Sequence, residues 1–160
     1  MENAGNPKES AAESNAHLEI SVPTALELQR LSLAVLIDIR QKFELEIQGE
    51  IPGASFLPLF QFKKMLGHNL SPLEQDALDA DEPELRDIQQ FLAMINQMHH
   101  SKEMILICVC NSGNRSLSAA RLLRLLGYEN SFSLAGGFRA LSEVGSSPQA
   151  LDRASGPAGH

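Results

Sequence analysis

The sequence predicts a single α/β domain in which a central parallel β-sheet is covered by α-helices on both faces. Two nearly continuous apolar runs, Ala34–Ile39 and Met104–Val109, are typical of strands that are buried on both sides. Amphipathic patterns predict helices over Glu84–Met98 and Leu117–Leu126. Strands that alternate with helices pair in parallel, because each connection crosses one face of the sheet. The length of 160 residues suits one such domain.

The other predicted elements are shorter and continue this alternation. Short strands are expected at Leu18–Ser21, Ser55–Leu57 and Phe132–Leu134. Helices are expected at Val22–Leu31, at Gln41–Glu46, from Ser71 onward with Pro72 as the first helical residue, and from Gly136 to Leu141. Ser21 is a suitable N-cap. Residues 1–17 and 144–160 have little apolar content and are predicted to be flexible tails, which leaves a domain over residues 18–143.

Charge and cysteine content restrict the function classes. The formal net charge of −7 argues against nucleic acid and against a membrane surface as partners, because both need a basic face. The two cysteines, Cys108 and Cys110, are too few and too close together for a secreted disulfide framework. The N-terminus lacks the features of a signal peptide, and no apolar stretch is long enough to span a bilayer. The expected compartment is therefore the cytoplasm.

The strongest chemical signal is the segment Cys110–Ser116, which reads Cys-Asn-Ser-Gly-Asn-Arg-Ser between a predicted buried strand and a predicted helix. Ligands bind at the carboxyl ends of parallel strands, where such loops lie. Small and polar residues let successive backbone N–H groups turn inward, and the following helix adds the positive end of its dipole. Arg115 adds a fixed charge. The segment is therefore expected to stabilise a negative charge at its centre.

Cys110 is the residue best placed to carry that charge. A thiol near a helix N-terminus and a cation ionises more readily, so Cys110 is expected to be largely thiolate at neutral pH and nucleophilic. The alternative is that Cys110 is a small buried hydrophobe at a strand end, a common role for cysteine. Cys108 lies on the same face of the strand, deeper in the core, and is expected to be structural rather than a resolving thiol.

In this loop and in three further segments, the sequence resembles the single-domain members of the rhodanese (thiosulfate sulfurtransferase-like) family. Asp38–Arg40 resembles the family's Asp-x-Arg strand end, and Gly49–Ala54 resembles its Gly-His-Ile-Pro-Gly-Ala turn. Leu134–Gly137 resembles the Leu-x-Gly-Gly motif after the last strand. The four segments occur in the family's order, over roughly residues 18–142. The resemblance implies the rhodanese-like fold.

The resemblance also implies a sulfurtransferase. Cys110 would take a sulfane sulfur from a donor such as thiosulfate or a persulfide, hold it as a persulfide, and pass it to cyanide or to a thiol, including a protein thiol. Arg115 would be the second catalytic residue, holding the loop closed and balancing the anionic charge. Backbone amides would surround the sulfur, from Asn111, Ser112, Gly113, Asn114 and Ser116. Asp38 and Arg40 are expected to be structural supports. No cofactor and no metal is implied, because the exchange runs through thiolate leaving groups.

The length of the loop separates this chemistry from its alternatives. Related phosphatases have five residues between cysteine and arginine, whereas four separate Cys110 from Arg115. The smaller ring suits one sulfur atom better than a phosphoryl or arsenate group, so a small cysteine phosphatase or arsenate reductase is less favoured. Asn111 stands where many members carry a basic residue, which counts against efficient use of thiosulfate. A sulfur-relay or regulatory protein-binding module with little thiosulfate activity is therefore the main alternative.

Other features depart from the family pattern or carry weak signals. The segment 58–101 is longer than in the most compact members, and an added helix there is expected to cover the site or bind a partner. Glu50 replaces the usual histidine of the turn, for which a modest effect is expected. His99 and His100 are adjacent on a helix end and do not face one another, so they predict no metal site.

Overall fold

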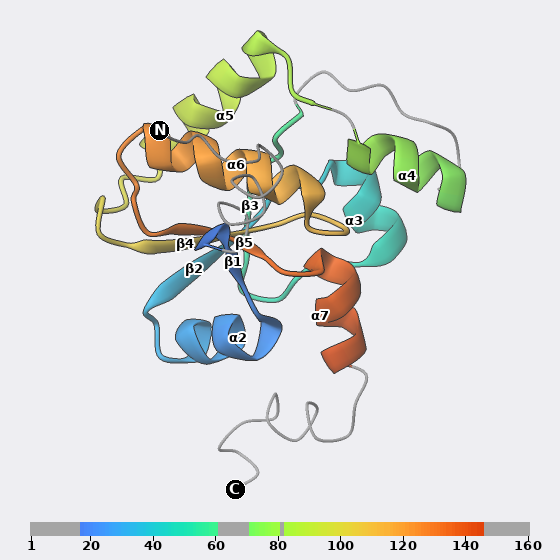
Figure 1. The fold of residues 1–160 in the computed structure, drawn as a ribbon, viewed down its shortest axis with the longest axis horizontal. Coiled ribbons are helices and arrows are strands. Elements are labelled where there is room, and N and C mark those ends of the chain that lie inside the picture. The colour runs from blue at the N-terminus through green and yellow to red at the C-terminus, as the bar shows by residue number, and fades with distance from the viewer. Residues whose placement is uncertain (1–16, 61–70, 81, 146–160) are drawn as a thin grey trace, which may run out of the picture.

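The computed structural model describes residues 17–60, 71–80 and 82–145. Its centre is a parallel sheet with the strand order β1-β5-β4-β2-β3 (Figure 1). The strands are β1 (Glu19–Ile20), β2 (Ala34–Asp38), β3 (Ser55–Phe56), β4 (Ile105–Val109) and β5 (Ser131–Leu134). The two apolar runs of the sequence form β2 and β4 in the interior of the sheet, because strands without a polar face need cover on both sides.

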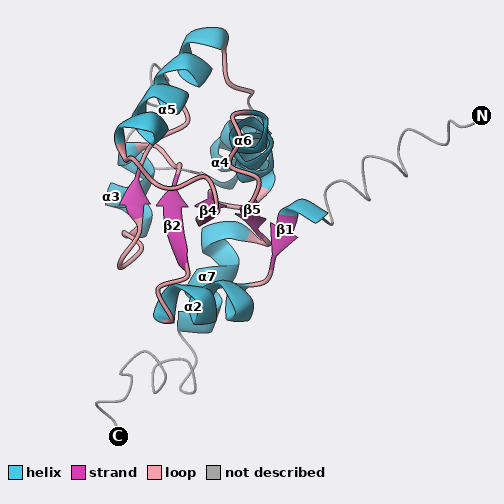
Figure 2. Cartoon of the chain, turned by 90° about the vertical axis from the view of Figure 1, so that its left-hand side faces the viewer, coloured by secondary structure: helices cyan, strands magenta, loops and turns pink. Residues whose placement is uncertain are grey.

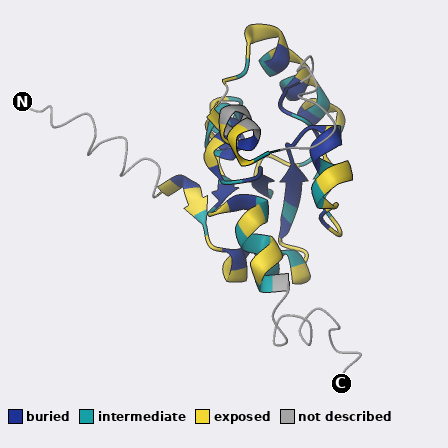
Figure 3. Ribbon diagram, turned by 90° about the vertical axis from the view of Figure 1, so that its right-hand side faces the viewer, coloured by how far each residue is buried: buried dark blue, intermediate teal, exposed yellow. Residues whose placement is uncertain are grey.

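Helices cover both faces of this sheet, which confirms the predicted fold class. α5 and α6 lie on one face, and α2 and α7 lie on the other (Figure 2). The helices are α2 (Val22–Arg30), α3 (Lys42–Gln48), α4 (Pro72–Ala80), α5 (Leu85–Gln97), α6 (Asn114–Leu125) and α7 (Gly137–Gly145). One apolar cluster joins α5 and α6 to the sheet, and a second joins α2 and α7 to its other face. The central strands between these clusters are almost entirely buried (Figure 3).

The carboxyl ends of β2 and β4 meet at one edge of the sheet. Asp38 is in register with Val109. One residue further, the N–H of Ile39 donates to the carbonyl of Val109 at 2.9 Å. Arg40 and Cys110 therefore leave the sheet at the same edge, although 70 positions separate them in the sequence. The sequence predicted the ligand site here, at the carboxyl ends of the parallel strands.

The predicted boundaries differ most at α6. This helix begins at Asn114 rather than at Leu117, because Gly113 takes a left-handed conformation, with φ of 102°, and forms the N-cap. Arg115 and Ser116 therefore lie in the first turn of the helix and not in the preceding loop. The polar character of these residues resembles that of a loop, which is why the apolar periodicity did not reveal the first turn.

The C-terminal helix is longer than predicted. α7 extends to Gly145 rather than ending near Leu141, so the predicted tail boundary at residue 144 falls inside a helix. The rest of the predicted tails, residues 1–16 and 146–160, lies outside the described residues. The other boundaries agree with the prediction to within two residues. No helix in the described part of the chain is long and apolar enough to cross a membrane.

Candidate active site

A short loop after β4 turns over the end of the sheet and surrounds the thiol of Cys110. This side chain is fully buried, and its Sγ accepts hydrogen bonds from the backbone N–H of Gly113 at 3.2 Å and of Ser116 at 3.3 Å. Ser116 lies in the first turn of α6, where the N–H groups have no partner within the helix and the helix dipole is positive. Two amides and a helix N-terminus therefore meet at this sulfur atom.

Two glycines allow the backbone to pack this closely. Gly113 has a positive φ. A Cβ at this position would lie 3.2 Å from the backbone N of Gly136 and 3.3 Å from the carbonyl oxygen of Leu134. Gly137 has φ of 60°, and a Cβ there would overlap the backbone oxygens of Cys110 and Asn111. In the space that the missing side chain leaves, the N–H of Phe138 donates to the carbonyl of Cys110 at 2.7 Å. The start of α7 is thus fastened directly to the loop.

Two buried hydroxyl groups lie beside the sulfur. The thiol of Cys110 donates to Ser116 Oγ, with 3.4 Å between Sγ and Oγ. Ser116 Oγ is 2.6 Å from Ser133 Oγ, and Ser133 Oγ donates to the carbonyl of Gly113 at 3.2 Å. The sequence analysis did not single out Ser133. The signal for it in the sequence is a polar residue within a strand that is buried. A hydroxyl can rotate, so Ser116 is able to accept from a thiol or to donate to a thiolate.

Arg115 is paired with a carboxylate. Its Nη1 and Nη2 donate to Oε2 and Oε1 of Glu44 at 2.8 Å and 2.7 Å, and both side chains are buried. The fork of a guanidinium on a carboxylate is a strong form of ion pair. The sequence predicted that Arg115 balances an anion at the loop centre, but Glu44 already matches its charge. The positive potential at Cys110 therefore comes from the backbone amides and the helix end.

Glu44 is a site residue that the sequence analysis missed. It stands three positions after Gln41, and its Oε2 accepts the backbone N–H of Gln41 at 2.9 Å, as in a capping box. That spacing predicts a helix start but not a buried ion pair, because the partner Arg115 is 71 positions away in the sequence. A further hydrogen bond reaches Glu44 Oε1 from Gln75 Nε2 of α4, at 3.3 Å.

Asp38 and Arg40 form a second buried ion pair. Arg40 Nε and Nη2 donate to Oδ1 and Oδ2 of Asp38 at 2.9 Å and 2.8 Å, and Nη2 also donates to the carbonyl of Gly49 at 2.9 Å. The guanidinium lies 4.1 Å from the centre of the Phe138 ring. Because the backbone of Phe138 is bonded to the carbonyl of Cys110, this pair contacts the loop through Phe138.

The remaining predicted loop residues take different positions. Asn111 is buried, Ser112 is half-buried, and Asn114 is exposed on the first turn of α6. The amide contacts to Sγ that the structure records come from two of the predicted residues, Gly113 and Ser116. In the described part of the chain, no three side chains of His, Cys, Asp or Glu gather in a way that would hold a metal ion.

Cys108 belongs to the same apolar cluster as Cys110, but the amides of the loop donate to Cys110. It is a free thiol, fully buried in the apolar cluster beneath α5 and α6. Burial raises the pKa of the Cys108 thiol, and a charge on Cys110 raises it further. Cys108 is therefore a protonated thiol at neutral pH.

Comparison with known proteins places this chain in a protein family. The family model for the rhodanese-like domain matches residues 22–143. The chain belongs to the rhodanese-like family. The match runs from the start of α2 into α7 and includes the whole loop around Cys110. The family resemblance that the sequence motifs predicted is thus confirmed.

Individual relatives of this rhodanese-like chain are sulfurtransferases. The human thiosulfate:glutathione sulfurtransferase is 31% identical over 121 residues, which cover 75% of this chain and 89% of that protein. The structure of a human single-domain sulfurtransferase matches with a TM-score of 0.52 at 28% identity, over 79% of this chain and 96% of that one. The polysulfide-sulfur transferase homodimer of Wolinella succinogenes shares the fold, with a TM-score of 0.57 at 17% identity over 86% of this chain and 82% of that one. The chain is a rhodanese-type sulfurtransferase, as predicted.

Proposed function

We propose that the protein carries a sulfane sulfur on Cys110, taking it from a small donor such as thiosulfate or a persulfide and passing it to cyanide or a thiol. The observation that supports this proposal most directly is the environment of Sγ. A fully buried sulfur atom accepts N–H groups at 3.2 Å and 3.3 Å next to the start of a helix. Backbone N–H groups at a helix N-terminus stabilise negative charge on an atom that they contact.

The transfer consists of two displacements at sulfur. In the first, the Cys110 thiolate attacks the outer sulfur of thiosulfate, an S–S bond forms, and sulfite leaves with the electron pair of the bond that breaks. In the second, cyanide or a thiolate attacks the outer sulfur of the Cys110 persulfide, and the thiolate is restored. Each step exchanges one bond to sulfur for another, so electrons balance without a further reactant. The amides of Gly113 and Ser116 stabilise the negative charge on the sulfur that Cys110 carries.

The other site residues have supporting roles in this proposal. Arg115 holds the first turn of α6 in place through its ion pair with Glu44. Asp38 and Arg40 hold the start of α7, on which the loop carbonyl of Cys110 rests. Cys108 takes no part, because its thiol lies in an apolar cluster and stays protonated.

A second candidate function is favoured by Asn111. This uncharged residue follows the cysteine directly, so the site lacks a cation there that would attract a free anion such as thiosulfate. A sulfur-relay module would instead receive sulfur from a persulfide on another protein. The two candidates share the Cys110 persulfide and differ in the donor.

Mass spectrometry of the intact protein tests both candidates. We expect wild-type protein to gain one sulfur atom from thiosulfate or from a low-molecular-weight persulfide, and to lose it on addition of cyanide. Cys110→Ser should gain nothing, whereas Cys108→Ser, the matched control two residues away, should gain sulfur like wild type. Loading by the persulfide but not by thiosulfate would favour the relay module. Failure of the wild type to load from either donor would contradict the proposal.

A further inference from the structure

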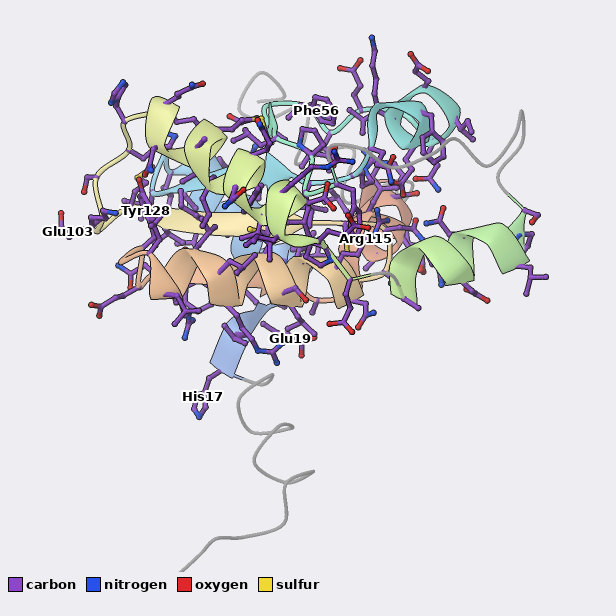
Figure 4. The ribbon with its side chains drawn as sticks, turned by 90° about the horizontal axis from the view of Figure 1, so that it is seen from above. His17, Glu19, Phe56, Glu103, Arg115 and Tyr128 are labelled. Atoms are coloured by element: carbon purple, nitrogen blue, oxygen red, sulfur yellow. The ribbon has the colours of Figure 1, made fainter. Side chains whose placement is uncertain are left out.

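Helix α4 places one buried side chain against the polar residues behind the Cys110 loop. Gln75 is 6% exposed, whereas the neighbouring side chains Leu73 and Asp76 are exposed. α4 packs against α6, and Figure 4 shows it beyond the end of α6 at which Arg115 lies. A glutamine that is buried between exposed neighbours such as these needs hydrogen-bond partners in the interior.

The hydrogen bonds of Gln75 form part of a chain with one consistent direction. Arg40 Nη1 donates to Gln48 Oε1 at 3.1 Å, and Gln48 Nε2 donates to Gln75 Oε1 at 2.8 Å. Gln75 Nε2 then donates to Glu44 Oε1 at 3.3 Å. Arginine only donates and a carboxylate only accepts, so both amides between them have a single orientation that satisfies the chain. Gln75 thereby links the ion pair of Arg40 to the ion pair of Arg115.

The carboxylate of Glu44 is filled by this arrangement. Oε2 accepts from Arg115 Nη1 and from the N–H of Gln41, and Oε1 accepts from Arg115 Nη2 and from Gln75 Nε2. Four donors occupy the roughly four lone-pair sites of an ionised carboxylate. Three of these donors belong to α6 or to the N-cap of α3, whereas Gln75 donates from α4. Gln75 thereby connects α4 to the carboxylate that holds Arg115.

The geometry points to Gln75 as a positioning residue for the Cys110 loop, a role that rests on the proposed sulfur transfer at Cys110. Arg115 is the neighbour in sequence of Ser116, whose amide and hydroxyl both contact Sγ. Gln75 fixes Glu44, Glu44 fixes Arg115, and Arg115 fixes the first turn of α6. In this role Gln75 contacts neither the sulfur donor nor the sulfur acceptor. We therefore expect its loss to lower kcat and to leave KM nearly unchanged.

Two substitutions separate this role from a general contribution to stability. Gln75→Leu removes both hydrogen bonds, and we expect kcat to fall about tenfold, the effect of one weakened hydrogen bond to a charged group. Gln75→Glu keeps the size and shape of the side chain. Its protonated carboxyl donates to Glu44 as the amide does, whereas its ionised form repels Glu44 and competes for Arg115. The kcat of Gln75→Glu relative to wild type is therefore highest at low pH and falls as the pH rises.

Among the described residues, the charged groups of the hydrogen-bond network around position 75 are Glu44 of α3, Arg115 of α6 and, through Gln48, Arg40. Arginine stays charged at any pH in the range, so the relative loss with rising pH reports the carboxyl at position 75 against Glu44. A purely structural role would instead lower the unfolding temperature without tilting the pH profile.

The experiment measures kcat and KM with thiosulfate and cyanide from about pH 6 to about pH 9, with Leu73→Gln as a control on the exposed side of α4. The rate of Cys110 alkylation by iodoacetamide is measured in parallel, because it reports the loop whether or not sulfur is transferred. A lowered kcat in Gln75→Leu, with the tilted profile in Gln75→Glu, supports the inference. If the wild type transfers no sulfur, the proposed function fails, and a tilted alkylation profile in Gln75→Glu still supports positioning. Folded Gln75 variants with wild-type kcat and wild-type alkylation profiles would overturn it.

Discussion

Cys108 lies in β4 and Cys110 directly follows the last residue of that strand, and both are fully buried. Both belong to one apolar cluster, but their hydrogen-bond contacts differ. Cys108 is enclosed by the apolar cluster beneath α5 and α6, and burial raises the pKa of its thiol. Cys110 passes the end of the strand, where its Sγ accepts two backbone N–H groups and lies 3.4 Å from a hydroxyl. In this molecule, hydrogen-bond donors rather than exposure distinguish the two thiols.

The largest expected effect comes from replacing each thiol separately. We expect Cys110→Ser to lower the rate of sulfur transfer by at least about a thousandfold, because it removes the nucleophile. Cys108→Ser should keep the rate within a factor of about two and lose about 1–3 kcal/mol of stability, since a hydroxyl replaces a thiol in an apolar cluster. Thiocyanate formation and urea unfolding measure the two quantities. Loss of transfer in a folded Cys108→Ser protein would indicate a mechanism that uses both thiols.

The next effect concerns the ion pair behind Cys110. Arg115→Ala leaves Glu44 buried without its cation, so we expect a loss of about 3–5 kcal/mol in the free energy of unfolding and a fall of about a hundredfold in transfer rate. Combining Arg115→Ala with Glu44→Gln removes the uncompensated charge, and should restore part of the stability but not the activity. Unfolding by urea and single-turnover sulfur loading give both readouts. Unchanged turnover in Arg115→Ala would eliminate the role assigned to Arg115.

The smallest effect is on the pH dependence of stability. Because burial raises the pKa of Cys108, the folded protein keeps this proton at alkaline pH, where the unfolded chain releases it. The stabilisation is complete below the pKa of an unfolded thiol, about 8.5, and is lost above it by about 1.4 kcal/mol per pH unit. We expect Cys108→Ala to flatten this slope between about pH 8 and about pH 10, as measured by urea unfolding. Cys110→Ala is the matched control, and an undiminished slope in Cys108→Ala would contradict the assignment.

The sequence predicted those parts of the fold whose cause is local. The buried strands β2 and β4 follow from apolar runs, and the start of α4 follows from Pro72 after Ser71. The first turn of α6 was missed because its start depends on the backbone of Gly113, which takes a positive φ. Apolar periodicity carries no information about that choice.

The site was predictable only in part, for a related reason. Cys110 and Arg115 belong to one short motif and were predicted from it. Glu44, Gln75 and Ser133 come from three other elements, and only the register of the sheet and the packing of α3 and α4 bring them together. A local motif therefore predicts Cys110 and Arg115, whereas the buried groups around them depend on contacts between distant parts of the chain.

The glycine at position 137 has a consequence for how this site can change over evolutionary time. Since no side chain fits there, the loop and α7 are joined by main-chain atoms, through the N–H of Phe138 and that of Arg139 on the carbonyls of Cys110 and Asn111. Hydrogen bonds between main-chain atoms do not depend on which side chain the residue carries, except at residues such as glycine and proline. The side chain of an exposed residue such as Arg139 is thus free to vary in size and charge while the backbone around Cys110 keeps its shape. The charge of the surface beside the loop is therefore able to change independently of the backbone geometry at Cys110.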